Sequence, residues 1–223
     1  MKPLLIAALA LAVAGVAGAE EHDTRDQLTA TQPAASALVA KMLSANPTLS
    51  SFKARVHVHT HMLSFPWLSP DLDGTSYFKR PRNYEVVFDR VPGYAKGFEK
   101  LFNDVGDPGS WQGDSYIALD GTRELGGKPM LVVKMTKKIY STTIDYTLAY
   151  VDPSDYTLAR MEFYYRNGGK ISMDQKFRSE SGYKLIDSQH AEIDIPRVRA
   201  VADSTYAAYQ TNVPVDPKVF TKR

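Results

Sequence analysis

The sequence has 223 residues, of which 43% are hydrophobic and 23% are charged; these are ordinary fractions for a globular protein and exclude a chain dominated by disorder. The 27 Lys and Arg residues against 25 Asp and Glu leave a net charge of only +2, and no basic run exceeds two residues. We therefore expect no nucleic acid partner. The lack of cysteine excludes disulfides, thiolate metal ligands, thiol nucleophiles and a lipidated N-terminal cysteine.

The first 19 residues have the pattern of a secretory signal peptide. Lys2 precedes a continuous apolar stretch at residues 4–16, and the tripeptide Ala-Gly-Ala at 17–19 supplies the small residues that signal peptidase requires. The alternative is a transmembrane anchor, for which this stretch is short, because a spanning helix needs about 18 apolar residues or more. We expect cleavage after Ala19 and a single exported domain at residues 20–223.

Two segments of the mature chain have the apolar spacing of helices. The first, at residues 33–44, is followed by the helix-ending pair Asn46-Pro47. The second, at residues 94–105, lies between turn-forming Pro-Gly and Gly-Asp-Pro-Gly sequences. We expect both to cover part of a sheet.

From Ser51 onward, apolar residues recur with a period of two, which is typical of half-buried strands. Pro81 interrupts the second of these strands, and turn signals such as Asp120-Gly121 and Gly126-Gly127 separate the later ones. The predicted strands are residues 51–62, 75–88, 114–120, 129–137, 142–151, 157–166, 170–178, 183–195 and 205–212.

The short connections require neighbouring strands to pair antiparallel, because a parallel pair needs a long crossover. We expect one α+β domain with about nine strands and two helices. One face of the later strands is apolar, as in the set Ile144, Tyr146, Leu148 and Tyr150, and two short helices cover little of such a face. These features predict a curved antiparallel sheet that forms an open, incomplete β-barrel with a helical lid; a fully packed core is the alternative.

Several short motifs are similar to those of a known family. A Ser-Phe-Lys-Ala strand start at residues 51–54 is followed by Gly74 and by a Lys-Arg-Pro turn at residues 79–81. This pattern resembles the LolA-like lipoprotein-carrier family of the Lol system. The segments at residues 151–170 and 215–220 also resemble that family.

The resemblance implies an open barrel, closed by helices, that carries acyl chains through the periplasm. It implies that Arg80 is a lid latch, hydrogen-bonded from inside the barrel; the alternative is an exposed arginine at a strand end. The implied partners are a lipid or lipoprotein acyl chains, an inner-membrane donor and an outer-membrane acceptor. We expect a non-enzymatic monomer without a cofactor. Residues 91–111 depart from the family pattern. The resemblance therefore does not predict the form of the lid or the identity of the cargo.

The expected lipid-binding side chains come from the apolar strand faces and from the second helix. They are Phe52, Val56, Val58, Phe78, Val86, Phe88, Phe98, Phe102, Tyr146, Leu148, Met161, Phe163 and Tyr165. Burial of acyl methylene groups against them, at about 0.8 kcal/mol each, would drive binding.

A stripe of histidines leaves a different function open. His57, His59 and His61 project from one face of a strand and can contribute ligands to a metal-dependent hydrolase, although most such stripes are simply solvated. No nucleotide-binding loop, nucleophile elbow or zinc-protease motif occurs in the sequence, so we expect no catalytic residues.

The loop at residues 62–72 is rich in proline and contains Phe65, Trp67 and Leu68. Such a loop can dock to a membrane surface or a protein partner, or it can fold back over the end of the barrel. An envelope sensor or scaffold that binds a protein partner without lipid cargo is therefore the second hypothesis.

Overall fold

The computed structural model describes residues 32–81, 83–91 and 108–221. The predicted signal peptide and the helix predicted at residues 94–105 lie outside the described residues. Within the described part, no helix is both long enough and apolar enough to cross a membrane.

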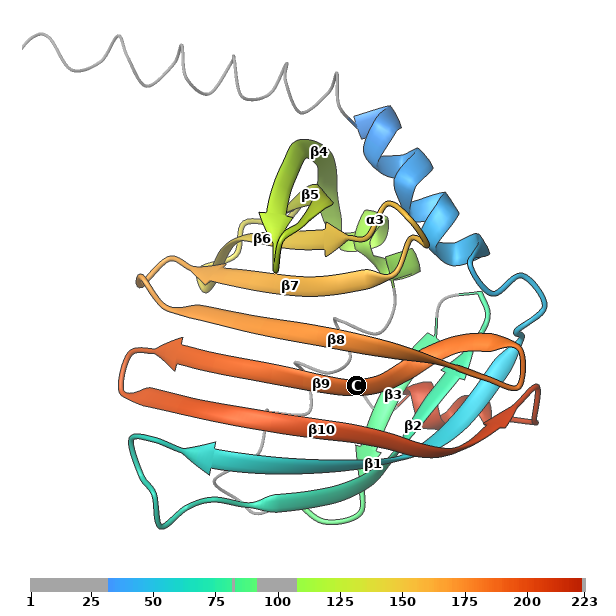
Figure 1. Ribbon diagram of the computed structural model, residues 1–223. Coiled ribbons are helices and arrows are strands. Elements are labelled where there is room, and N and C mark those ends of the chain that lie inside the picture. The colour runs from blue at the N-terminus through green and yellow to red at the C-terminus, as the bar shows by residue number, and fades with distance from the viewer. Residues whose placement is uncertain (1–31, 82, 92–107, 222–223) are drawn as a thin grey trace, which may run out of the picture.

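Ten strands form one antiparallel sheet in the order β3-β2-β1-β10-β9-β8-β7-β6-β5-β4 (Figure 1). They are β1 (Ser51–Met62), β2 (Asp71–Lys79), β3 (Asn83–Phe88), β4 (Ser115–Leu125), β5 (Lys128–Lys137), β6 (Ile144–Val151), β7 (Leu158–Tyr165), β8 (Lys170–Glu180), β9 (Tyr183–Ile195) and β10 (Val198–Thr211). Because β3 and β4 lie at the two ends of this order, the sheet of the described residues is not closed into a barrel. The predicted open, curved antiparallel sheet is confirmed.

A helix at residues 32–44 precedes the sheet and confirms the helix predicted there. It crosses one end of the sheet, at the upper right of Figure 1, and forms the helical lid of the described chain. Its buried side chains pack on the main core; they are Ala35, Leu38, Val39 and Met42. The remaining helical elements are short: η2 (Pro108–Ser110), α3 (Trp111–Asp114) and η3 (Pro217–Thr221).

The segment predicted as one interrupted strand at residues 75–88 is a hairpin. The chain reverses at Arg80-Pro81, so that Phe78 of β2 pairs with Tyr84 of β3. Proline lacks the N–H group that a central strand position requires, so it ends a strand. Whether the chain then continues or reverses depends on the partner strands, and the sheet therefore has one strand more than predicted.

The pair Asp120-Gly121, predicted as a turn, lies inside β4. The pairing of β4 with β5 shifts register between Leu119 and Thr122, and Gly121 has a φ of +84°. Glycine adopts this conformation without a steric penalty, so the pair forms a β-bulge. The chain reverses only at Gly126-Gly127, as predicted.

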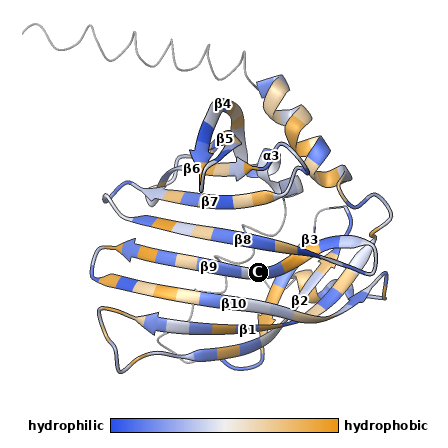
Figure 2. Ribbon diagram, viewed as in Figure 1, coloured by the Kyte–Doolittle hydropathy of each residue, from blue (hydrophilic) through white to orange (hydrophobic). Residues whose placement is uncertain are grey.

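The two faces of the sheet differ as the alternation in β1 predicts. Phe52, Val56 and Val58 are buried, whereas His57 and His59 are exposed. The buried side chains of β1 join a main core on the inner face of the sheet, which the helix at residues 32–44 also contacts. Figure 2 shows polar and apolar residues alternating along β7 to β10 in the same way.

Strand β6 departs from the predicted faces. Its pairing with β7 shifts register between Ile144 and Tyr146, so Ile144 packs on the main core whereas Tyr146, Leu148 and Tyr150 form a second cluster on the outer face. The prediction that these four side chains share one face is therefore wrong. A shift of one residue reverses the face of every side chain that follows, and the alternation of residue types does not reveal where a bulge lies.

Gly74, one of the motif residues, lies on β2 opposite Phe88 of β3, where there is no room for a side chain. A Cβ atom at this position would lie 2.6 Å from the carbonyl oxygen of Val87 and 2.9 Å from the Cα atom of Phe88. A larger residue would therefore push β3 away from β2.

Candidate functional site

An apolar pocket opens on the inner face of the sheet, beneath the end of the helix at residues 32–44. It has a volume of about 150 Å³ and is lined by this helix and the following turn, by β1 to β3, and by β7 to β9. Its apolar lining residues are Met42, Leu43, Leu49, Phe52, Phe78, Leu158, Phe177, Leu185 and Ile186. This lining can bury a hydrocarbon chain.

Aromatic rings form one wall of the pocket. Phe52 and Phe78 stack with their ring centroids 5.3 Å apart. The rings of Tyr84 and Tyr209 meet Phe52 edge-on, with centroids at 6.4 Å and 5.3 Å. Rings in these arrangements attract one another beyond simple area burial, so this wall keeps its shape when the pocket is empty.

Arg80 lies at the rim of the pocket, directly after the last residue of β2. Its Nε donates to the carbonyl oxygen of Leu49 at 2.5 Å, and a terminal nitrogen donates to the carbonyl oxygens of Leu43 at 3.2 Å and of Asn46. These carbonyls belong to the end of the helix and the turn after it, where helical carbonyl groups lack partners within the helix. Arg80 therefore attaches the lid helix to the β2–β3 hairpin. The Arg80 side chain is exposed at the rim of the pocket and is not enclosed by the sheet. In its exposure it matches the alternative stated above, an exposed arginine at a strand end.

The same turn is attached to the opposite wall of the pocket. Asn46 Nδ2 donates to the carbonyl oxygen of Lys184 at 2.8 Å, and Lys184 N donates to Asn46 Oδ1 at 2.9 Å. The Lys184 ammonium group forms an ion pair with Asp155. Burial alone would raise the pKa of Asp155, but hydrogen bonds from Lys184 and Thr157 outweigh burial and lower that pKa. The end of the lid helix thus bridges both walls through polar contacts at the rim.

Buried polar side chains lie on the inner face beside the apolar lining. The hydroxyl of Tyr206 donates to Gln189 Oε1 at 2.7 Å. Burial raises the pKa of both Tyr84 and Tyr206, so their hydroxyl groups stay protonated. Within the described part of the chain, the amide nitrogen of Gln175, which lines the pocket, has no hydrogen-bond partner. Because buried donors without a partner are rare, this amide is suited to an acceptor on a molecule bound in the pocket.

The structure separates the predicted lipid-binding residues into groups. Phe52 and Phe78 line the pocket. Val56, Val58, Val86, Met161 and Phe163 are buried in the main core, and Phe88 and Tyr165 pack at its margin. Tyr146 and Leu148 belong to the second cluster on the outer face, which removes them from the inner cavity. Phe98 and Phe102 lie outside the described residues.

The pocket residues that the sequence analysis missed come mainly from the lid helix, the turn after it and the ends of β7 to β9. Met42 belongs to the predicted helix at residues 33–44 and Phe177 to the predicted strand at residues 170–178, but nothing in the local pattern connects two segments that are more than a hundred residues apart. Leu49, Leu158 and Leu185 carried no signal beyond being apolar. Only the curvature of the sheet brings these side chains together.

The histidine stripe lies on the outer face, where His57 and His59 each pair with one aspartate of β2. His57 Nδ1 is 3.0 Å from Asp73 Oδ1, and His59 Nδ1 is 2.6 Å from Asp71 Oδ1. Among the residues that the structure describes, no group of three or more His, Cys, Asp or Glu side chains is arranged to hold a metal ion.

Solved structures share this architecture over most of their length. A DUF1329 family protein from Desulfovibrio piger matches with a TM-score of 0.66 and 12% identity, over 85% of this chain and 97% of that chain. A LolA superfamily protein from Nitrosomonas europaea matches with a TM-score of 0.61 and 16% identity, over 84% and 97%. The chain has a LolA-like fold. A putative outer membrane lipoprotein-sorting protein domain from Vibrio parahaemolyticus also matches, with a TM-score of 0.61 and 8% identity, over 87% and 97%.

This LolA-like fold confirms the resemblance carried by the Ser-Phe-Lys-Ala and Lys-Arg-Pro motifs. No family model matches the sequence, and no curated protein matches it either. At identities of 8% to 16% the likeness is one of fold, so the argument about cargo depends on the pocket of this chain itself.

Proposed function

We propose that this protein is a periplasmic, non-enzymatic carrier that binds a lipid, or the acyl chains of a lipoprotein, and transfers it towards the outer membrane. The observation that carries this proposal is the apolar pocket beneath a helical lid on the inner face of an open LolA-like sheet. The likeness to a lipoprotein-sorting domain supports the same class of cargo. The mature carrier would comprise residues 20–223 and exchange cargo with an inner-membrane donor and an outer-membrane acceptor.

The pocket has to widen to hold a full acyl chain. Its volume of about 150 Å³ is smaller than the roughly 300–1,000 Å³ of common ligand pockets. The helix at residues 32–44 is suited to move, because the contacts of Arg80 and Asn46 at its end are hydrogen bonds that water can replace. Opening the lid also exposes Leu38, Val39 and Met42, which are buried against the main core, at about 1.5–3 kcal/mol each, and each lost hydrogen bond costs about 1 kcal/mol net. Since each acyl methylene that enters contributes about 0.8 kcal/mol, a long acyl chain of about 12 methylene groups or more is needed to open the lid.

The unpartnered amide of Gln175 in the pocket supports a cargo that is more than a bare hydrocarbon. An ester or amide carbonyl group of an acylated molecule is the acceptor that such a donor requires. A diacyl lipid or a lipidated protein end offers both this carbonyl group and the apolar chains.

The carrier proposal is tested by native mass spectrometry of the mature protein, purified from its own periplasm without detergent and followed by organic extraction. We expect a stoichiometric adduct with the mass of an acylated lipid or lipopeptide. A bare mass that persists after incubation with phospholipid vesicles would contradict the carrier function and favour a scaffold that binds a protein partner.

Replacing Arg80 with Leu is expected to raise the affinity of the pocket for cargo by about tenfold. The closed lid loses the hydrogen bonds to Leu43, Asn46 and Leu49, whereas the loaded state, in which the lid has already left, loses nothing. Cargo should therefore dissociate more slowly, and transfer to an acceptor should be impaired in a protein that remains folded. Titration and displacement of a neutral fluorescent phenylnaphthylamine probe measure both quantities.

Arg55→Leu is the matched control for the latch. Arg55 is also an exposed arginine, but its guanidinium group bonds to Thr75 and Asp89 instead of the lid helix. Probe affinity and release that are the same in Arg80→Leu as in the wild type and in Arg55→Leu would refute the latch role.

A further inference from the structure

Exposed apolar side chains gather at one end of the sheet strands. Leu63, Phe65 and Trp67 lie in the loop between β1 and β2, and Ile139 and Tyr140 lie in the loop between β5 and β6. Trp67 is 77% exposed, Ile139 85% and Tyr140 73%. These residues are five of the eight large hydrophobic side chains that are exposed among the described residues, so their position is not random scatter.

The first loop is held with its apolar tips outward. Leu63 N donates to the carbonyl oxygen of Arg199 at 2.8 Å, and Arg199 N donates to Ser64 Oγ at 2.8 Å, which fastens the loop to the start of β10. The rings of Phe65 and Trp67 meet edge-on with centroids 6.0 Å apart. The loop is thus a fixed projection from the end of the sheet, and the indole of Trp67 does not fold back over it.

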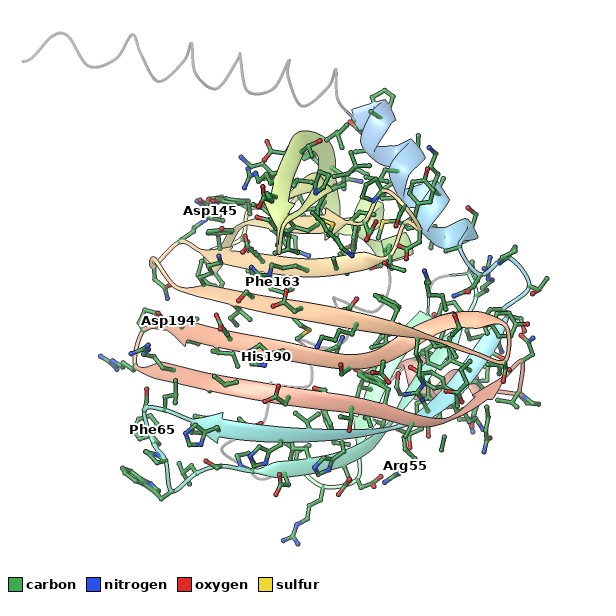
Figure 3. The ribbon with its side chains drawn as sticks, in the orientation of Figure 1. Arg55, Phe65, Asp145, Phe163, His190 and Asp194 are labelled. Carbon is green, nitrogen blue, oxygen red and sulfur yellow. The ribbon has the colours of Figure 1, made fainter. Side chains whose placement is uncertain are left out.

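The second loop is fastened to the neighbouring β7–β8 turn through Arg166. Arg166 Nε donates to the carbonyl oxygen of Ser141 at 2.7 Å, and its guanidinium carbon lies 4.6 Å from the centre of the Tyr140 ring. Between the two loops, the β7–β8 and β9–β10 turns border an open polar hollow of about 360 Å³, whose charged lining residues are Arg197, Arg199 and Asp194. Figure 3 shows Phe65, Asp194 and Asp145 along this same side of the molecule.

We call this surface the docking edge: the β1–β2 and β5–β6 loops together with the β7–β8 and β9–β10 turns. The loops and turns themselves carry three basic residues, Lys138, Arg166 and Arg197, and no acidic residue. Within two residues of the adjoining strand ends, Lys137, Lys170 and Arg199 stand against Asp71, Asp145 and Asp194, so the edge is positive overall. Asp145 lies 2.9 Å from Arg166. Asp194 lies 3.8 Å from Arg199, but these two side chains are 73% and 66% exposed, so this weak pair leaves Arg199 able to bind a phosphate.

The arrangement fits a flat anionic surface better than a protein partner. Five strand spacings separate β1 from β6 in the sheet, so the two apolar loops are roughly 24 Å apart along the curve, with the arginines between them. A protein interface concentrates its aromatic anchors in the centre and its charges at the rim, which is the reverse order. At a bilayer surface, aromatic tips enter the boundary of the acyl chains while arginines bind lipid phosphates.

We propose that the docking edge binds the surface of a bilayer that contains anionic phospholipid. The tips of both loops insert into the interfacial region, and Arg197 and Arg199 hold phosphate groups in the hollow between them. The cargo pocket lies at the opposite ends of the strands: β8 begins at Lys170, beside the docking edge, and reaches the pocket at Phe177. Docking therefore leaves the lid free to move.

Vesicle flotation tests this proposal with phosphatidylethanolamine–phosphatidylglycerol vesicles against pure phosphatidylcholine vesicles. We expect the protein to float with the anionic vesicles and to be released by salt. Trp67 provides a direct signal, because Trp111, the other of two tryptophans, is already buried. Its emission should shift to the blue with anionic vesicles, and brominated lipid should quench it.

The double variant Arg197→Gln/Arg199→Gln should bind vesicles about thirtyfold more weakly, because each basic residue near an anionic membrane surface contributes a similar share of the binding free energy and two are lost. Phe65→Ser/Trp67→Ser should lose about tenfold or more. The matched controls are Arg55→Gln and Val87→Ser, which alter an exposed arginine and an exposed apolar residue on other strands. Wild-type protein that does not float, floats equally with both vesicle types, or floats as well after both double substitutions would overturn the proposal.

Probe binding in the same variants separates docking from cargo carriage. Both double variants should keep the phenylnaphthylamine affinity of the wild type, because no substituted residue lines the pocket. Vesicle binding by a protein that takes up no probe would support the docking edge and count against the carrier function.

Discussion

Phe177→Asp is expected to lower the affinity of the pocket for an apolar probe by about a hundredfold or more. Phe177 lines the pocket from β8 and is partly exposed when the pocket is empty. A carboxylate there can stay hydrated in the empty protein, but an incoming acyl chain would displace its water without replacing the hydrogen bonds. The larger part of the cost therefore falls on the loaded state, and the loss of the contacts of Phe177 with the main core adds a smaller cost to folding. A titration with the phenylnaphthylamine probe measures the change.

Two companion variants make the result on Phe177 interpretable. Val87→Asp introduces the same charge at an exposed position on β3 that does not line the pocket, and we expect it to bind the probe normally. Phe177→Leu keeps an apolar side chain and should also bind. Undiminished probe binding by a folded Phe177→Asp protein would place the cargo elsewhere.

Glu162→Gln is expected to destabilise the protein by about 2 kcal/mol at neutral pH. Glu162 lies on β7 with its side chain only 5% exposed. Lys170 Nζ donates to its Oε1 at 2.7 Å, and the hydroxyls of Tyr164 and Tyr150 donate to its Oε2 at 2.9 Å and 3.0 Å. The neutral amide of Gln has the same shape as the carboxylate but cannot form the ion pair with Lys170. Its NH2 group is a hydrogen-bond donor and would face other donors, the Lys170 ammonium group or the tyrosine hydroxyls. The expected loss is moderate because Lys170 remains partly exposed to water.

The pH dependence of this loss has a defined sign. Burial alone would raise the pKa of Glu162, but the hydrogen bonds from Lys170, Tyr164 and Tyr150 outweigh burial and lower the pKa. A carboxylate whose pKa is lowered in the folded state stabilises the protein above the pKa of the unfolded chain, about 4.3. That contribution is lost as the pH falls through the folded-state pKa. The difference between the wild type and Glu162→Gln should therefore shrink in acid.

Urea unfolding at neutral and at acidic pH measures the contribution of Glu162. Glu192→Gln is the matched control, since the Glu192 side chain on β9, two strands away from β7, is 71% exposed, and we expect little change in the stability of the protein at either pH. A difference between Glu162→Gln and the wild type that stays constant from neutral to acidic pH would show that the carboxylate charge is not the cause.

Local patterns were sufficient for the elements that depend on nearby residues. The alternation from Phe52 to Met62 predicted both the bounds and the buried face of β1, and the stripe with Leu38 and Met42 predicted the lid helix. The Lys-Arg-Pro and Ser-Phe-Lys-Ala motifs pointed to the LolA-like fold, which the structural likeness confirms. Of the pocket-lining residues, Phe52 and Phe78 were predicted from the strand pattern, and Arg80 from the resemblance.

Other features depended on register, which no local pattern encodes. The bulge between Ile144 and Tyr146 moves Tyr146 and Leu148 out of the predicted lipid-binding surface, and it does so through the pairing of β6 with β7. Glu162 alternates with the inner-face residues Met161 and Phe163 and so lies on the outer face, where a charged residue is expected to be exposed; it is buried because the outer face at β5 to β7 has a hydrophobic cluster of its own. Both errors arise because the prediction assumed regular alternation and one wet face along β6 and β7. The pairing of these strands and the second cluster break that pattern.

The sequence by itself determined the antiparallel sheet with its inner face and the lid helix, because periodicity and turn chemistry act between neighbours in the chain; the signal peptide at residues 1–19 stays a prediction. Only the tertiary structure decided which apolar side chains meet in a pocket, and that Arg80 bonds to carbonyl groups more than thirty residues before it. It also decided that loops from β1–β2 and β5–β6 share one edge. The physical reason is that these contacts arise from strand order and sheet curvature, which are properties of the whole sheet and not of any segment.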